Sequence, residues 1–166
     1  MEISKKSRVW IYQADRPFSL HEEHTVKGKL NDFVGQWEAH GNKLAAMAEV
    51  RYNRFIVLMV DEAQAGATGC SIDKSVSLMK QIENDFGVNL FDRFNIAYRN
   101  DSGIQSCGRE AFEKLIAEGS INEETIVFNN LVQTIEDLDE NWEVPFRKSW
   151  HSKVFGNLIT PQTSVS

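Results

Sequence analysis

The chain has 166 residues, of which 42% are hydrophobic and 25% charged. That is enough for one well-buried core and too short for two domains by default, so we expect a single domain over residues 1–166. The formal net charge of −6 argues against nucleic acid as a partner, because a phosphate backbone attracts basic surfaces.

The amino terminus carries Lys5 and Lys6, but no apolar segment of a signal peptide follows, and no run reaches membrane-spanning length. Cys70 and Cys107 are too few for a disulfide framework and lack the spacing of a metal site. The sequence therefore predicts a soluble, cytoplasmic protein with free thiols and no membrane partner.

Four segments in the first hundred residues have the pattern of β-strands. Residues 8–13 and 55–60 are rich in uninterrupted apolar residues, which is typical of strands covered on both faces. Residues 44–52 and about 90–99 alternate between apolar and polar, which predicts strands with one solvated face. Asn53 and Arg54 predict a tight hairpin between the second and third of these strands.

Two helices are predicted between the strands. Apolar residues recur at helical spacing over 21–40 and over 72–86. Gly41 and Gly87 follow these segments and are expected to end the helices, since glycine readily adopts the left-handed conformation of a helix terminus.

The resulting order is strand, helix, strand, strand, helix, strand, which matches the ferredoxin-like βαββαβ unit. In that unit the first and third strands are central, and the two uninterrupted apolar runs occupy those positions. The predicted fold class is α+β, with a ferredoxin-like core over about 8–99.

A C-terminal extension over about 104–160 is expected to add to this core. Residues 109–118 predict a helix that Gly119 ends. For 125–140, a strand over 125–132 followed by a helical turn over 135–140 is favoured, and one continuous helix remains the alternative. An aromatic closing arm follows, and 161–166 are expected to be a frayed tail. The residues of the arm are Trp142, Pro145, Phe146, Trp150 and Phe155.

The loop after the third strand is the main candidate site. Small residues let its backbone approach a ligand, and the following helix presents unpaired amides that could bind an anion. Ser71 and Asp73 are expected to cap those amides themselves, and the charge of Asp73 would repel an anion. The candidate binding residues are Asp61, Gly66, Thr68, Gly69, Ser71 and Asp73.

Cys70 is the candidate nucleophile. A thiol in the first turn of a helix is close to unpaired amides, which favour the thiolate. His40 and His151 are the imidazoles that could serve as its base, although no spacing brings them together. The alternative is a buried cysteine that only packs beneath the helix.

A metal site is a weaker candidate. His21 and His24 lie three residues apart on a predicted helix, but a site needs a third ligand. Glu22 and Glu23 in a solvated first turn explain the same residues without a metal, because acidic side chains complement the helix dipole. We therefore expect no metal or other cofactor.

Residues 56–62, an apolar strand ending in Asp61 and Glu62, are typical of a Walker B strand. Most of the chain, including 69–73 and 149–151, resembles an uncharacterised bacterial family, mostly from Bacteroidetes, commonly labelled "ABC transporter ATPase". That label implies nucleotide hydrolysis. The chain nevertheless lacks an LSGGQ-like signature and a Walker A motif: in the nearest string, 69–75, Asp73 replaces the second glycine.

The function favoured by the sequence is a non-enzymatic binding or interaction module with its site near 66–73. A ferredoxin-like sheet leaves one face open, which C-terminal elements, a ligand or a second subunit of a homodimer could cover. The partner is thus a small ligand or a protein. The alternatives are an enzyme that uses Cys70 with a histidine, and the nucleotide hydrolase that the family label implies.

Overall fold

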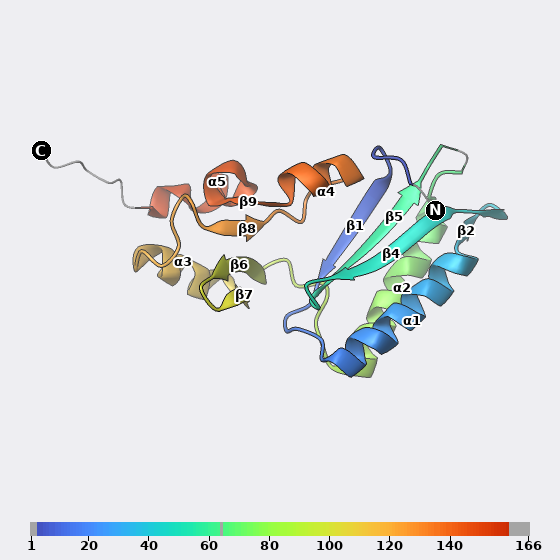
Figure 1. The fold of residues 1–166 in the computed structure, drawn as a ribbon, viewed down its shortest axis with the longest axis horizontal. Helices are drawn as coiled ribbons and strands as arrows, with labels where there is room; N and C mark the ends of the chain where they lie inside the picture. Colours follow the sequence, from blue (N-terminus) through green and yellow to red (C-terminus); the bar gives the residue numbers. More distant parts are fainter. Residues whose placement is uncertain (1–2, 64, 160–166) are drawn as a thin grey trace, which may run out of the picture. The chain divides into compact units, whose positions relative to one another are not determined.

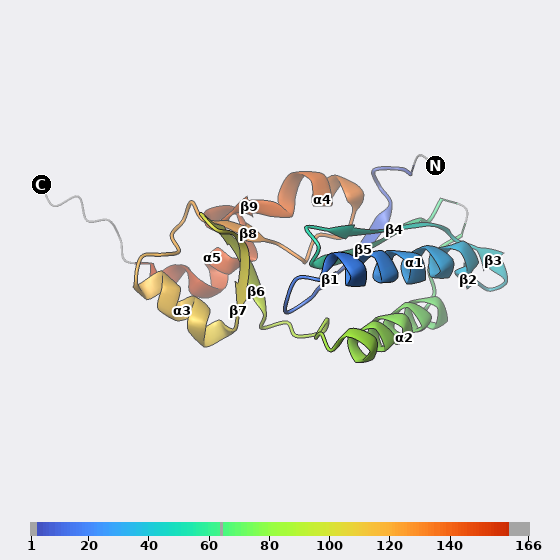
Figure 2. The same cartoon turned by 60° about the horizontal axis from the view of Figure 1, so that its bottom comes forward.

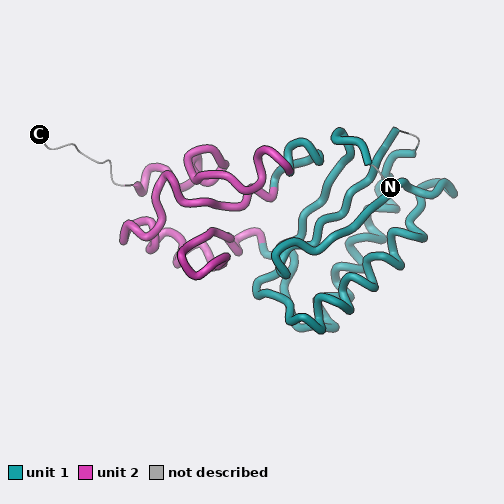
Figure 3. Tube along the Cα trace, viewed as in Figure 1, with its two compact units in different colours: residues 1–92, 131–138 teal, residues 93–130, 139–166 magenta. Residues whose placement is uncertain are grey.

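The computed structural model describes residues 3–63 and 65–159 and shows an α+β protein, as predicted. The chain divides into two compact units (Figure 3). Unit 1 comprises residues 1–92 and 131–138, and unit 2 comprises residues 93–130 and 139–166. The single domain expected from the chain length stays a prediction. The tail over 161–166 lies outside the described residues.

Unit 1 contains an antiparallel sheet of three strands in the order β1-β5-β4 (Figure 1). β5 (Phe55–Asp61) lies in the centre, between β1 (Arg8–Gln13) and β4 (Ala45–Arg51). Every residue of β5 except the last is buried, as its uninterrupted apolar sequence predicts for a central strand. Three of the predicted strands are therefore confirmed.

Two helices, α1 (Leu20–Gln36) and α2 (Gly69–Phe86), lie on one face of this sheet (Figure 2). Alternate residues of β5 point toward the helices, since successive side chains of a strand face opposite sides. The core between the layers includes Ile56, Leu58 and Val60 from β5, Val26 and Leu30 from α1, and Met79 and Ile82 from α2.

Residues 131–138 return to unit 1 and run beside β1. The Val9 amide donates to the Gln133 carbonyl (2.9 Å), and the Ile135 amide donates to the Ser7 carbonyl (3.0 Å). An isolated bridge joins Arg8 to Thr134. A short stretch of the C-terminal region thus occupies the outer edge of β1.

That edge is where a ferredoxin-like fold would hold its fourth strand. The segment predicted for it, about 90–99, forms β6 (Ile96–Asn100), which belongs to a different sheet in unit 2. β6 pairs instead with β7 (Gly103–Cys107) across a turn at Asp101 and Ser102. A hairpin partner only a few residues away has a low loop-closure cost. The ferredoxin-like topology is therefore not confirmed.

The end of α1 differs from the prediction. Gly41 was expected to end the helix, but the helix ends at Gln36, and Trp37 is its extended C-cap. The chain then forms a small hairpin, β2 (Glu38–Ala39) and β3 (Asn42–Lys43). His40 and Gly41 form its turn with φ of 52° and 78°, so the glycine serves a tight turn and not a helix end.

The sheet of unit 2 has four strands in the order β7-β6-β8-β9. β8 (Ile126–Phe128) lies within the predicted strand over 125–132 but is shorter, and β9 (Glu143–Pro145) pairs with it. The strand interpretation of this segment is therefore confirmed over the continuous helix.

The helices of unit 2 include α3 (Arg109–Ala117), as predicted, and α5 (Trp150–Phe155). The predicted helical turn over 135–140 is confirmed as α4 (Ile135–Asn141), which begins in unit 1 and ends in unit 2. Two single 3₁₀ turns, η1 (Phe146–Lys148) and η2 (Gly156–Leu158), flank α5.

The aromatic closing arm fills the core of unit 2. Phe146 and Phe155 pack there against Phe112 of α3, with ring centroids 6.4 and 5.1 Å away. Because the arm supplies large apolar side chains to its own small sheet, it is part of the structure of unit 2.

Candidate functional site

The side chains of Thr68 and Ser71 cap the first turn of α2. Thr68 is the N-cap: its Oγ1 accepts from the Ser71 amide (3.2 Å), and the Thr68 amide donates to the Ser71 Oγ (2.7 Å). Ser71 is buried, and its carbonyl accepts the indole N–H of Trp37 (2.8 Å). These bonds attach the start of α2 to the end of α1 and pair amides that an anion would need.

A carboxylate already occupies the preceding loop. Glu62 Oε2 accepts from the Ala67 amide (2.9 Å), and Asp61 Oδ1 accepts from the Ala63 amide (3.1 Å). A Cβ added at Gly66 would lie 3.0 Å from Glu62 Oε2, so the glycine makes room for this carboxylate. Glu62, whose Oε1 lies 4.0 Å from Arg8 Nη1, therefore already occupies the Ala67 amide that an anionic ligand would need.

The expected capping role of Asp73 is wrong. The helix begins at Gly69, so Asp73 lies in its second turn and is exposed. Ser71 does take part in capping, but as the third helical residue, whose side chain and amide bond to Thr68. In the sequence, Thr68 could have identified the true N-cap, because Thr-x-x-Ser has the spacing of a capping box.

This arrangement makes a stability prediction for the loop. Thr68→Ala should lower the free energy of unfolding by about 1 kcal/mol, because the Ser71 amide loses its acceptor. Asp73→Ala is the matched control and should change it by less than about 0.5 kcal/mol. Urea unfolding of the two variants beside the parent measures both. A larger loss for Asp73→Ala than for Thr68→Ala would contradict the cap assignment.

Cys70 is exposed, as the second residue of α2. His40 is also exposed, in the turn between β2 and β3 of the same unit. Among the described residues, Cys70 makes no hydrogen bond to either candidate imidazole. The predicted thiol is therefore reachable by solvent, without an imidazole bonded to it.

His151 belongs to unit 2 and is 1% exposed. Its Nδ1 lies 2.7 Å from the Ser149 hydroxyl, and its ring stacks on Trp150 with centroids 3.8 Å apart. Burial among aromatic rings lowers the pKa of His151 to about 3, because the charged imidazolium loses its hydration. The residue is thus a neutral core histidine in this environment.

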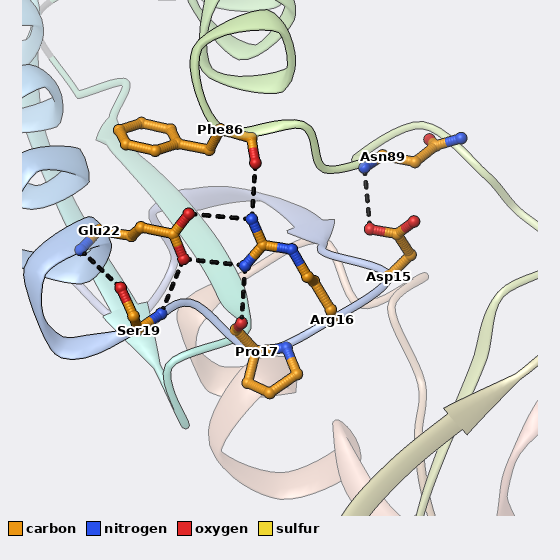
Figure 4. Close-up of polar contacts among 7 residues, drawn as sticks. All are labelled: Asp15, Arg16, Pro17, Ser19, Glu22, Phe86 and Asn89. Carbon is orange, nitrogen blue, oxygen red and sulfur yellow. Dashed lines mark hydrogen bonds and ion pairs between the residues drawn. The ribbon is translucent and has the colours of Figure 1, made fainter.

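Glu22 follows His21, the first histidine of the candidate metal pair, and is bound by an arginine (Figure 4). Arg16 donates to both oxygens of Glu22 (2.8 and 2.9 Å) and to the carbonyl of Phe86 at the end of α2 (2.6 Å). Glu22 also forms a capping box with Ser19. The hydrogen bonds from Arg16, followed by those from Ser19, lower the pKa of Glu22 to about 2. Arg16 therefore links Glu22, at the start of α1, to the end of α2.

β4 has an open edge that the sequence patterns do not reveal. Among residues 3–63 and 65–159, β5 is the one strand that pairs with β4. The Arg54 amide donates to the Arg51 carbonyl, so the polar groups of Arg51 face β5. Since backbone polar groups alternate in direction along an antiparallel strand, those of Ala46, Ala48 and Val50 face outward.

A hollow of about 350 Å³ lies beside this edge, between α1 and the start of β4. Small side chains create it: Gly35 of α1 has no heavy atom within 4 Å of an added Cβ, and Ala45 and Ala46 line the strand side. Val34 and Leu44 add apolar side chains to its lining, and its remaining lining residues are Asn31 and Lys43.

Two features of the sequence could have located this edge. Gly35 interrupts the helical pattern of 21–40 at a position where glycine costs about 1 kcal/mol of helix stability relative to alanine. The strand over 44–52 is rich in alanine, which is a poor strand former. Together, a glycine in the helix and alanines in the strand indicate a surface where large side chains are absent.

Comparisons with protein families, curated proteins and solved structures found no match for this chain. In the described part of the chain, no three His, Cys, Asp or Glu side chains gather closely enough to hold a metal ion. None of the described helices combines the length and apolar character needed to cross a membrane.

Proposed function

We propose that the protein is a non-enzymatic interaction module that binds an extended chain segment along the open edge of β4. Such a segment would add one strand to the sheet of unit 1 through main-chain hydrogen bonds. The observation that carries the proposal is the row of outward-facing backbone groups on Ala46, Ala48 and Val50 beside an apolar hollow. This is the mode of recognition known as β-strand addition.

Three features of the edge support strand addition. It is a regular strand of seven residues, a length at which a partner can form several main-chain hydrogen bonds. Two of its helix-side residues, Ala46 and Ala48, have the smallest side chain after glycine, and Ala46 lines the hollow. Glu49 and Arg51 form an ion pair on its other face, and charged residues on an edge limit indiscriminate pairing.

The hollow supports one position of side-chain recognition. Its lining is mostly apolar, and its volume of about 350 Å³ is at the lower end of ligand pockets. Lys43 is the single charged residue among those that line it. An aliphatic side chain of the bound segment therefore fits there, and an acidic neighbour would be favoured by Lys43.

The candidates near 66–73 have less support. Hydrogen bonds within the loop already satisfy the Ala67, Thr68 and Ser71 amides, and Glu62 supplies a negative charge there. A thiol enzyme would need a base beside Cys70. A nucleotide hydrolase would need a glycine where Asp73 stands.

Backbone amide exchange tests the proposed function. In dilute protein, the amides of Ala46, Ala48 and Val50 should exchange rapidly with solvent, and those of Met47 and Glu49 slowly, because only the latter bond to β5. A synthetic peptide of alternating valine and threonine, which favours extended structure, should slow exchange of the first group. Slow exchange of those three amides in the dilute, peptide-free protein would contradict the proposal.

The hollow offers a matched pair of variants for the same peptide titration. Gly35→Gln places a side chain in the hollow and should weaken peptide binding by about tenfold, equivalent to about 1.4 kcal/mol. Gly28→Gln is the control: this position lies two turns earlier on α1, has equally open surroundings, and does not line the hollow. Equal loss of binding in both variants would place the binding site elsewhere.

A further inference from the structure

We propose that the segment bound along β4 is the β4 strand of a second copy of this chain, paired antiparallel about a two-fold axis at Ala48. The proposal rests on the strand-addition function above and names its partner. The two sheets would then form one continuous sheet across the dimer, with α1 of each copy on the same side of it.

The register follows from the length and direction of the strand. With Ala48 on the axis, Ala45 faces Arg51 of the second copy, and Met47 faces Glu49 of the second copy. All seven residues of β4 are then paired. Ala46 faces Val50 of the second copy, and both have outward backbone groups, so each facing pair of this kind exchanges two hydrogen bonds.

Charge disfavours the registers centred on Met47 and on Glu49. With Met47 on the axis, Arg51 would face Lys43 of the second copy, two positive charges directly opposite. With Glu49 on the axis, each Glu49 would face its own equivalent. Like charges directly opposite each other destabilise a strand pair. The register centred on Ala48 places no like charges opposite each other.

Backbone geometry excludes the next two registers. An axis at Ala46 would need the amide of Leu44, which already donates to the Trp37 carbonyl (2.9 Å). An axis at Val50 would extend the pairing over Tyr52 and Asn53, whose φ angles of 53° and 47° turn the chain away from the strand direction. The Ala48 axis is the register that uses the whole free edge.

The hollow complements the same register. It lies beside Ala46, and the residue facing Ala46 is Val50 of the second copy. The helix side of the sheet is where both side chains point. The isopropyl group of that valine would therefore lie beside the apolar hollow, and the two-fold symmetry would form this contact twice.

The mass of the native protein in solution is the first test. Sedimentation equilibrium should give about twice the chain mass of 18.9 kDa, and dilution should restore the monomer. Ala48→Pro removes an outward amide that β5 does not use, so the fold should persist, as circular dichroism will report, while the protein becomes monomeric. A dimer that survives Ala48→Pro would overturn the proposed interface.

Cross-linking tests the register. In a background of Cys70→Ser and Cys107→Ser, Ala48→Cys places two thiols on the axis, where mild oxidation should join the copies. Ala45→Cys is the matched control, because in this register the two thiols are separated by the length of the strand. Joining through Ala45→Cys, or the absence of joining through Ala48→Cys in a sample with the dimer mass, would overturn the register.

Amide exchange separates failure of this inference from failure of the proposed function. Under the inference, exchange at Ala46, Ala48 and Val50 slows as protein concentration rises. If exchange stays fast at every concentration and only the valine–threonine peptide slows it, the edge binds strands but not a second copy, and the inference fails alone. If neither slows it, both fail.

Discussion

Acidification from pH 6.5 toward pH 5 is expected to lower the free energy of unfolding, by about 1.4 kcal/mol per pH unit once the pH is well below 6.5. The cause is His151. Its pKa is about 3 in the folded protein and 6.5 in the unfolded chain, where the ring is hydrated. Within this window the unfolded state therefore binds a proton that the folded state does not, so protonation favours unfolding.

The loss of stability should continue down to about pH 3, where the folded state also takes up the proton. Urea unfolding between pH 7 and pH 5 isolates His151, because carboxylates in the unfolded chain titrate lower, near pH 4. Glu22, with its folded pKa of about 2, adds a loss of the same sign below about pH 4.5.

The variant that removes this dependence is His151→Phe combined with Ser149→Ala. Phenylalanine keeps an aromatic ring against Trp150, and alanine avoids leaving the Ser149 hydroxyl buried without its partner. In this double variant, the free energy of unfolding should change little with pH between pH 6.5 and pH 5. His40→Gln alters an exposed imidazole in a turn and is the control. A slope that persists in the double variant would show that another group is responsible.

Phe112→Ala is expected to cost about 3–5 kcal/mol of stability, the usual range for deleting a fully buried aromatic ring. Phe112 is completely buried and lies at the centre of the core of unit 2. Its ring is 5.1 Å from that of Phe155 and 6.0 Å from that of His151. Removing it leaves a cavity between α3 and the aromatic closing arm.

Chemical unfolding of Phe112→Ala, Phe112→Leu and Val154→Ala measures the effect. Phe112→Leu should lower the free energy of unfolding less than Phe112→Ala does, because leucine keeps much of the side-chain volume. Val154 is an exposed residue of α5, so Val154→Ala should lower the free energy of unfolding by less than about 0.5 kcal/mol. A loss at Phe112 no larger than at Val154 would contradict the assignment of this ring to the core.

The candidate site was predicted in part. Sequence patterns located a small-residue loop leading into a helix, and the structure places Thr68, Gly69 and Ser71 at the start of α2. They did not show that Glu62 fills this loop, because that contact depends on how the loop folds back. For His151, the sequence could not tell a general base from a buried core residue.

Local patterns by themselves determined the α+β class, the three strands of unit 1 and the body of both long helices. Burial on one face repeats every two residues in a strand and about every 3.6 in a helix, and these periods are visible within a short window. Gly87, with φ of 63°, ends α2 as predicted. The left-handed conformation that ends a helix depends on the residue itself, and glycine adopts it readily.

The tertiary structure alone decided which strands pair. The fourth predicted strand became β6, beside a hairpin neighbour and β8, while residues 131–138 took the edge of β1. The alternating pattern of a strand predicts that one of its faces is buried, but it does not identify the element that packs against that face. Partner choice is the sum of contacts distant in sequence, and for the same reason the free edge of β4 became visible only in the folded chain.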